Sequence, residues 1–70
     1  MTDYLRVMRI EEVIKRTGLA RSSIYKYALN RTFPQQVQLG VGGAVGWLEH
    51  EVNAWVKEQI EKSRGETSNA

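Results

Sequence analysis

The sequence has no cysteine and only one histidine, and it is only 70 residues long. Without cysteine it can form neither a disulfide nor a thiolate metal site, and one histidine cannot hold a metal ion alone. A core of this size rarely supplies more than about 3–5 kcal/mol, and it leaves little room for a deep catalytic pocket. We therefore expect one small domain with no enzymatic activity, no cofactor and no metal.

Long apolar runs are missing as well. No stretch approaches the roughly 20 apolar residues of a membrane helix, and the N-terminus lacks the basic segment and apolar stretch of a signal peptide. The absence of disulfides favours a reducing compartment. The sequence therefore predicts a soluble, cytoplasmic protein with no membrane partner.

Acidic residues are absent from half of the chain. The span between Val13 and Leu48 has none, although the net charge of the whole chain is only +2. The basic residues of this span are Lys15, Arg16, Arg21, Lys26 and Arg31. An acid-free basic surface suits a polyanion, most simply nucleic acid, although charges also cluster by chance in short chains.

The apolar spacing predicts three helices. An apolar stripe, with acids first and bases last, predicts a helix over 11–16. A second helix is expected over 21–30, where Ile24 and Ala28 lie four residues apart and no helix breaker intervenes. The strongest pattern predicts a closing helix over 49–63, again with acids in its first turn and bases in its last.

From residue 36 the apolar residues alternate with other residues, and Gly40, Gly42 and Gly43 separate two such runs. This pattern predicts a β-hairpin over 36–47. Two registers are open. A two-residue turn at Gly42-Gly43 would pair Leu39 with Gly46 and place the two apolar rows on opposite faces of the hairpin. An odd-length loop centred on Gly42 would pair Leu39 with Val45 and give one buried face. We expect the odd-length loop.

The domain is expected to cover residues 1–63, followed by a disordered polar tail over 64–70. Leu5-Arg6-Val7 favours a short strand or an extended arm. The core is expected to consist of Trp47, Trp55, Val52 and Ile60, packed beneath Val13, Ile14, Leu19, Ile24, Phe33 and Leu39.

A helix-turn-helix is indicated by residues 17–20, which separate the first two predicted helices. Gly18 can adopt the backbone angle that a tight turn requires, and Leu19 fills the angle between the helices. Val13 and Ile24 are the apolar contacts expected to fix the crossing. The alternative is a helical hairpin with no DNA role.

The second predicted helix carries the side chains best suited to DNA. A rotation of 100° per residue turns Ser22 and Lys26 away from the core. Arg21 and Lys26 can reach guanine N7 and O6, and Ser22 and Ser23 can bond bases or phosphates. Tyr25 either contacts a phosphate or packs against the domain.

Further contacts to the DNA backbone are expected around this helix. Arg31, and Lys15 or Arg16, would lie beside phosphates, where cations position a protein without reading sequence. The hairpin follows the reading helix at the place where a winged helix carries its wing, and Gly42-Gly43 permits close approach to the backbone. A glycine turn without a ligand is the alternative. We thus expect a winged helix-turn-helix that binds double-stranded DNA.

Three spaced motifs give the sequence a family resemblance. They are T-G-L-x-R-S-x-I-Y at 17–25, F-P at 33–34 and W-L-x-x-E-V-x-A-W at 47–55. The chain from about Leu5 to Ile60 resembles the AlpA family of prophage regulators, which is similar to MerR-type winged helix-turn-helix proteins and phage excisionases. The resemblance implies a mainly α, α+β fold with a small β-hairpin. It also implies a bacterial or phage-encoded protein that binds specific DNA and regulates transcription of mobile-element genes.

Two positions depart from the family pattern. Ala20 stands where the family usually has a serine, which would cap the second helix. The family's wing usually carries an arginine shortly before the Val-x-Trp, whereas residues 41–44 are uncharged and apparently one residue longer. An arginine contact from the wing tip therefore cannot be carried over to this chain.

Two alternative functions remain open. Related small proteins are excisionases, which bend attachment-site DNA for an integrase and use the same reading head. The other alternative is a protein-binding adaptor that uses the acidic face of the closing helix, with Glu49, Glu51, Glu58 and Glu61. Besides DNA, the expected partners are an integrase or a second copy of the chain on DNA.

Overall fold

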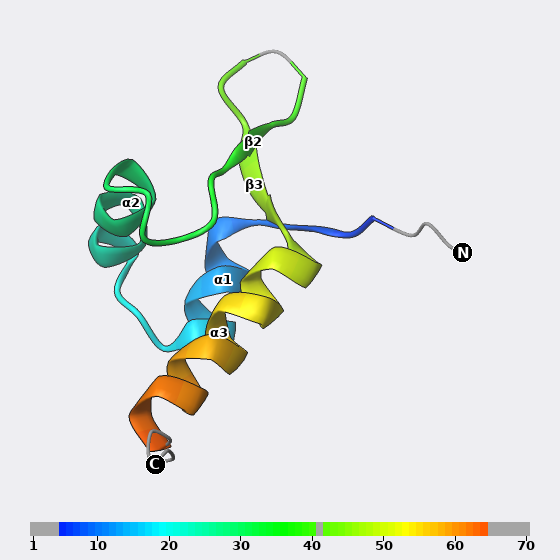
Figure 1. The fold of residues 1–70 in the computed structure, drawn as a ribbon. Helices are drawn as coiled ribbons and strands as arrows, with labels where there is room; N and C mark the ends of the chain where they lie inside the picture. Colours follow the sequence, from blue (N-terminus) through cyan, green and yellow to red (C-terminus); the bar gives the residue numbers. More distant parts are fainter. Residues whose placement is uncertain (1–4, 41, 65–70) are drawn as a thin grey trace.

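The computed structural model describes residues 5–40 and 42–64 (Figure 1). Three helices and a small antiparallel sheet confirm the predicted α+β, mainly helical fold. In chain order the elements are β1 (Val7–Met8), α1 (Ile10–Thr17), α2 (Arg21–Leu29), β2 (Val37–Gln38), β3 (Val45–Leu48) and α3 (Glu49–Arg64). The last helix includes Arg64, which the sequence placed in a tail, and the rest of that expected tail lies outside the described residues.

The turn between α1 and α2 has the predicted glycine geometry. Gly18 has a φ of 78°, in the left-handed region, and its N–H donates to the Ile14 carbonyl at 2.8 Å. The Thr17 hydroxyl donates to the Val13 carbonyl at 2.8 Å and accepts the Leu19 N–H at 3.2 Å. The chain therefore leaves α1 sharply and enters α2 after two more residues.

The sheet has three strands in the order β1-β3-β2, and both pairings are antiparallel. In β1, Val7 pairs with Leu48 and Met8 pairs with Trp47. The sequence favoured an extended segment at Leu5–Val7 but did not predict its partner. This pairing makes β3 the central strand and brings the N-terminal segment against it.

The expected hairpin register is wrong. Val37 pairs with Gly46, and the Leu39 N–H donates to the Ala44 carbonyl at 2.8 Å, so neither the odd-length loop nor the two-residue turn is present. The physical reason lies in the central strand. A Cβ at Gly46 would overlap Val7 Cγ1 and lie 3.3 Å from Leu39 Cδ1, so the observed register places both side chains over a glycine that leaves room for them.

Beyond this register the hairpin tip contains Gly40, Gly42 and Gly43, all with φ between 75° and 90°. Left-handed backbone of this kind is accessible to glycine at low cost, so a longer even-length loop closes the hairpin. The remaining residue of that loop, Val41, lies outside the described residues.

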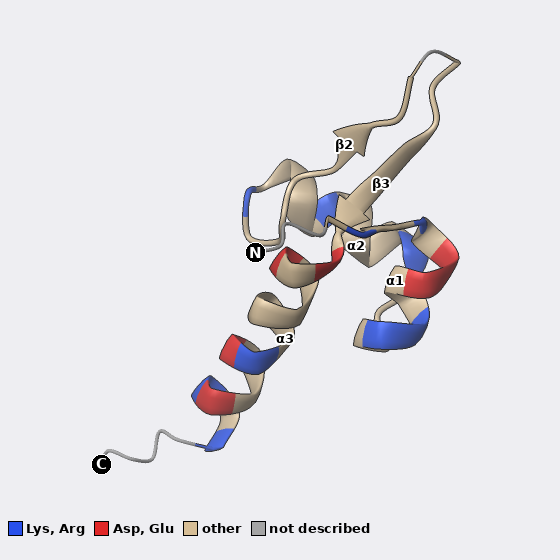
Figure 2. Cartoon of the chain, turned by 90° about the vertical axis from the view of Figure 1, so that its right-hand side faces the viewer, with Lys and Arg blue, Asp and Glu red and all other residues tan. Residues whose placement is uncertain are grey.

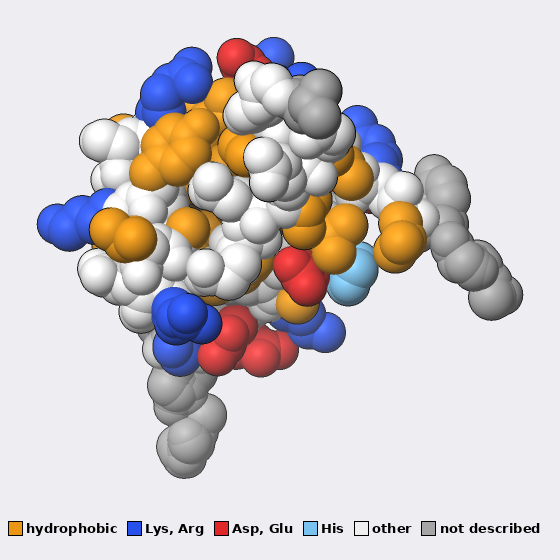
Figure 3. Space-filling model, turned by 90° about the horizontal axis from the view of Figure 1, so that it is seen from above, with side chains coloured by type: hydrophobic (Ala, Val, Ile, Leu, Met, Phe, Trp, Pro, Cys, Tyr) orange, Lys and Arg blue, Asp and Glu red, His pale blue; other side chains and the backbone are white. Residues whose placement is uncertain are grey.

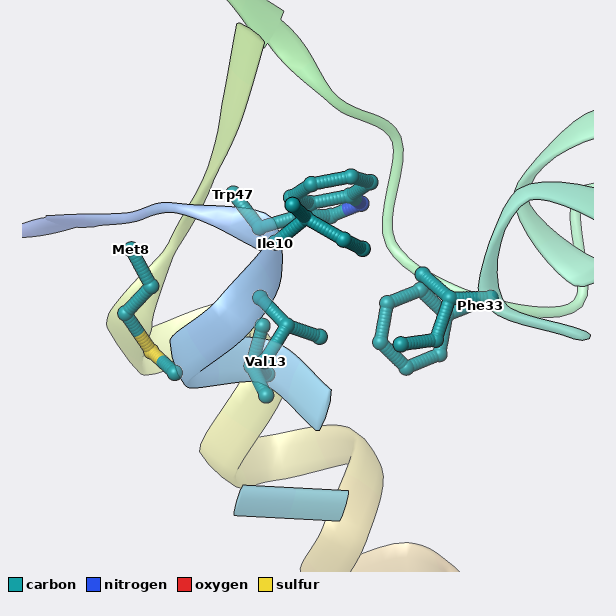
Figure 4. Packing of buried hydrophobic residues seen from close by; sticks show 7 residues of the cluster. Met8, Ile10, Val13, Phe33 and Trp47 are labelled. Atoms are coloured by element: carbon teal, nitrogen blue, oxygen red, sulfur yellow. The ribbon is translucent and has the colours of Figure 1, made fainter. Parts of the chain in front are cut away.

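The core lies where α1, α2, α3 and the sheet meet (Figure 4). Its buried hydrophobic residues are Met8, Ile10, Val13, Ile24, Ala28, Phe33, Trp47 and Val52. Met8 is fully buried although the expected core omitted it, because β1 docks on β3. Ile60 was expected in the core but is 46% exposed, since the end of α3 extends past the body of the domain (Figure 2).

Two indoles hold the segment that connects α2 to β2. Trp47 Nε1 donates to the Pro34 carbonyl at 3.1 Å, and Trp55 Nε1 donates to the Thr32 carbonyl at 2.7 Å. The Phe33 ring packs edge-on against Trp55 with ring centroids 4.8 Å apart. These contacts fix the position of α2 relative to the sheet and α3.

No helix in the described part of the chain is long and apolar enough to cross a membrane.

Candidate nucleic-acid interface

One face of α2 packs on the core and the opposite face is exposed. Ile24 and Ala28 are buried, whereas Ser22 and Lys26 are exposed, as the helical rotation predicted. No acidic residue occurs in α2. The exposed side of α2 therefore carries polar and basic side chains from Arg21 to Lys26.

The start of α2 also favours an anion. Ala20 precedes the helix in an extended conformation, and no side chain caps the helix end. The first turn contains no acid that would occupy the positive end of the helix dipole. Unpaired amides at a helix start attract phosphate, so the missing serine at this position leaves donors that DNA can satisfy.

Arg21 stands at the first position of α2, next to the start of α1. Its guanidinium lies 4.0 Å from the Glu11 carboxylate, and the two side chains are 55% and 72% exposed. Exposed pairs at this distance contribute little to stability. Arg21 can therefore leave Glu11 for a phosphate or a base.

Tyr25 is both packed and exposed. Its ring centroid lies 5.8 Å from that of Trp47 at an angle of 55°, which is a stabilising tilted contact. The residue is still 39% exposed. The structure thus supports the packing role that the sequence left open and keeps an accessible edge for a ligand.

Arg16 does not lie free beside the expected DNA backbone. Its NH1 donates to Asn53 Oδ1 at 2.6 Å, and its NH2 lies 3.4 Å from Glu49 Oε2 and 3.7 Å from Glu12 Oε2. Arg6 pairs with the same two carboxylates, with Glu12 at 2.8 Å and with Glu49 at 3.3 Å. Arg16 therefore binds α1 to α3, whereas Lys15 is the cation of this pair for which no such bond to α3 is found among the described residues.

Lys15 and Arg31 are exposed, as a phosphate contact requires. Arg31 follows α2 with a φ of 64°. Arg9 was not a candidate in the sequence, but the structure brings it close to the hairpin, where its Nε donates to the Val45 carbonyl at 3.1 Å. This placement of Arg9 follows from the antiparallel pairing of β1 with β3, which the sequence did not predict.

The hairpin of β2 and β3 projects from the body of the domain at the top of Figure 1, and we call β2, β3 and the loop between them the wing. Gly42 and Gly43 lie in it and are exposed. A Cβ built at either position would meet nothing within 4 Å, so their glycine identity reflects backbone conformation or the approach of a ligand. Seen from above, the side of the molecule that holds α2 carries Lys and Arg around apolar side chains (Figure 3).

Acidic residues lie at the start of α1 and along α3, where they alternate with basic residues (Figure 2). Glu49 does not belong to the exposed acidic face that the sequence suggested, because it pairs with Arg6 and Arg16. Glu51 and Glu58 border an open groove between α3 and the α2–β2 connection. The acid-free span of the sequence thus becomes an acid-free α2, whereas Glu11 and Glu12 of α1 lie close to Arg21 and Arg16.

Comparisons with known proteins find one family model and two relatives. The model of the family described as "Prophage CP4-57 regulatory protein (AlpA)" matches residues 6–60. The chain is 46% identical over 55 residues to "Uncharacterized protein ORF88" of Enterobacteria phage P4, covering 79% of this chain and 61% of that protein. It is 36% identical over 61 residues to the "DNA-binding transcriptional activator AlpA" of Escherichia coli K12, covering 79% of this chain and 86% of that protein. No solved structure gives a significant match.

Proposed function

Because this chain belongs to the AlpA family of prophage regulatory proteins, we propose that it regulates transcription by binding a specific double-stranded DNA sequence through α2. In this proposal α2 enters the major groove, and Arg21 and Lys26 read guanine while Ser22 and Ser23 contact bases or phosphates. Lys15 and Arg31 hold adjacent phosphates, and the glycines of the wing approach the backbone.

The observation that carries the proposal is the exposed, acid-free face of α2 on a rigid helix-turn-helix. Lys26 and Ser22 point away from the buried Ile24 and Ala28, and the uncapped start of the helix favours phosphate. The E. coli relative is named a DNA-binding transcriptional activator, which supports the same activity in this chain.

The test is the affinity of variants for the DNA upstream of the chain's own gene. We expect Arg21→Ala and Lys26→Ala each to weaken specific binding by about 1–3 kcal/mol, because each removes a contact to a base. Lys57→Ala is the matched control, since it removes one exposed cation from α3, and it should leave affinity unchanged. Both α2 variants binding as tightly as the parent, with unchanged melting temperature, would refute the proposal.

Excisionase activity would use the same surface. Protection mapping on the gene's upstream DNA and on the nearest attachment site separates the two roles. Protection confined to the promoter supports transcriptional regulation. Protection of repeated sites in the attachment region supports excision, as does the loss of integrase-dependent excision in Lys26→Ala.

A second candidate function, binding of a protein partner, is favoured by the groove beside α3. Its apolar lining includes Pro34, Val37, Leu48 and Trp55, and its rim carries Glu51 and Glu58. Such a groove suits a basic, apolar segment of a partner such as an integrase. Binding to purified integrase that survives Lys26→Ala but is lost in Glu51→Lys/Glu58→Lys would establish this function.

A further inference from the structure

Leu29 is the exposed apolar residue of α2. It is 82% exposed, on a helix whose inward face is occupied by Ile24 and Ala28. A single exposed leucine is common on protein surfaces and needs no explanation by itself. Its position on the helix and its surroundings are what give this one a role.

Leu29 lies on the same stripe of α2 as the residues proposed to read DNA. At 100° per residue, Ser22, Lys26 and Leu29 point within about 60° of one another, at i, i+4 and i+7. All three are exposed. Seven residues of helix extend about 10 Å, which spans roughly three base-pair steps. A helix that places Ser22 and Lys26 against base edges therefore brings Leu29 to the same groove.

The surroundings of Leu29 are uncharged and shaped as a hollow. Tyr25, Ala28, Leu29, Gln35 and Gln36 line it. Gln35 forms a fixed wall, because its Nε2 donates to the Ala28 carbonyl at 2.7 Å and to the Phe33 carbonyl at 3.1 Å. The ring of Tyr25 is held by Trp47 on its other side. The hollow therefore offers a preformed apolar surface and no cation for a phosphate.

We propose that Leu29, with Tyr25 beside it, contacts the methyl group of a thymine in the major groove and so selects an A·T pair at one position of the site. The inference rests on the proposed function. Thymine is the base that presents a methyl group in the major groove, so an apolar side chain there distinguishes it from the other bases. Lys26 and Ser22, on the same stripe, supply the polar contacts at the neighbouring positions.

The test uses the full chain and duplexes enriched by it from a random pool. In the best duplex, each thymine is replaced in turn by deoxyuridine, which removes only the methyl group. We expect one position per bound chain at which the dissociation constant rises about fourfold, the factor that corresponds to burying one methylene-sized group. Base pairing is unaltered, so the loss reports the methyl contact alone.

Two variants assign that loss to a residue. In Leu29→Ala the parent duplex should bind about fourfold more weakly and deoxyuridine at the same position should cost nothing more, as a double-mutant cycle requires for a direct contact. Leu5→Ala, which also removes an exposed leucine but lies outside α2, should retain the full deoxyuridine effect. Leu29→Met, which keeps an apolar side chain at this position, should show part of the deoxyuridine effect that Leu29→Ala lacks. Since Leu29 is exposed, the melting temperature of Leu29→Ala should equal that of the parent.

The outcomes separate this inference from the function beneath it. If the pool yields no enriched duplex, the proposed function fails. If duplexes are enriched but every deoxyuridine is tolerated, or if Leu29→Ala retains the deoxyuridine effect, the thymine contact is overturned while DNA binding stands. If Leu29→Ala changes only cooperative binding to tandem sites, the hollow contacts a second copy of the chain, and the thymine contact is likewise overturned.

Discussion

At the scale of single residues, the backbone of Arg31 is the most unusual feature. In the described part of the chain it is the one non-glycine residue with a positive φ, at 64°. The Thr32 N–H donates to the Tyr27 carbonyl at 2.9 Å. This hydrogen bond is typical of a helix end that is followed by a residue in the left-handed conformation, here Arg31. Glycine normally occupies that position, because a side chain there costs about 1–2 kcal/mol. Within residues 5–40 and 42–64, the Arg31 side chain forms no hydrogen bond or ion pair in return, and strain of this kind is found at functional sites.

Replacing Arg31 with glycine should raise stability and lower function. We expect Arg31→Gly to increase the free energy of unfolding in urea by about 1 kcal/mol, because it relieves the left-handed strain. DNA affinity should fall at the same time, since a phosphate contact is lost.

Asn30→Gly is the matched control, since Asn30 has a φ of −83° and no strain to relieve. It should lower stability by up to about 1 kcal/mol through added freedom of the unfolded chain. A loss of stability in Arg31→Gly would contradict the strain argument.

At the scale of elements, the three helices could be predicted from the sequence because each has a repeating apolar face and a recognisable end. Gly18 follows α1 directly, and the predicted end of the second helix at residue 30 lies one residue beyond the observed end of α2. The strands could not be predicted as well. A two-residue strand such as β1 has no period to detect, and the hairpin register depends on Gly46 fitting beneath β1, a contact that is formed only in the folded sheet.

The candidate site shows the same limit. Charge and helical rotation predicted which α2 side chains are exposed, since both are local properties. They could not distinguish Lys15 from Arg16, because the partners of Arg16 are on α3, 33 and 37 residues away in sequence. Arg9 and Leu29 were missed for opposite reasons. Arg9 approaches the wing only through tertiary contacts, whereas the helical position of Leu29 is a local property that could have been read from the sequence.

Lys15 and Arg16 are adjacent cations with different surroundings: Arg16 is bonded to α3, and Lys15 is the phosphate contact that we propose. We expect Arg16→Ala to lower the free energy of unfolding by about 1 kcal/mol, because it removes bonds of a partly exposed network between α1 and α3. Lys15→Ala should leave stability unchanged and weaken DNA binding. Urea unfolding and a DNA titration of both variants measure the two effects. Equal effects on both quantities in the two variants would show that the assignment is wrong.

At the scale of the whole molecule, the distribution of charge matters more than its sum. The net charge of +2 is small, but α2 contains no acidic residue, whereas acidic and basic residues alternate along α3 (Figure 2). The balanced cluster of Arg6, Arg16, Glu12 and Glu49 adds no net charge to either side. The molecule is thus expected to approach DNA in one orientation.

The salt dependence of binding measures how many cations take part. With Lys15 and Arg31 on phosphates, log K should fall with log salt concentration at a slope of about −2. Removing either of them should make the slope shallower by about 1, whereas Lys57→Ala should leave it unchanged. A slope near zero for the parent would argue against an interface built on these side chains.

The two indoles that hold the connection after α2 give the protein an internal optical reporter. Trp47 is fully buried, lies against Tyr25 of the reading helix and is bonded to Pro34, while Trp55 is bonded to Thr32 a few residues away. Any event that shifts α2 against the sheet changes the surroundings of one indole, and any event that opens the α3 side changes those of the other. The emission of Trp47→Phe and Trp55→Phe proteins, recorded without an attached dye, would therefore tell apart ligands that engage the two faces.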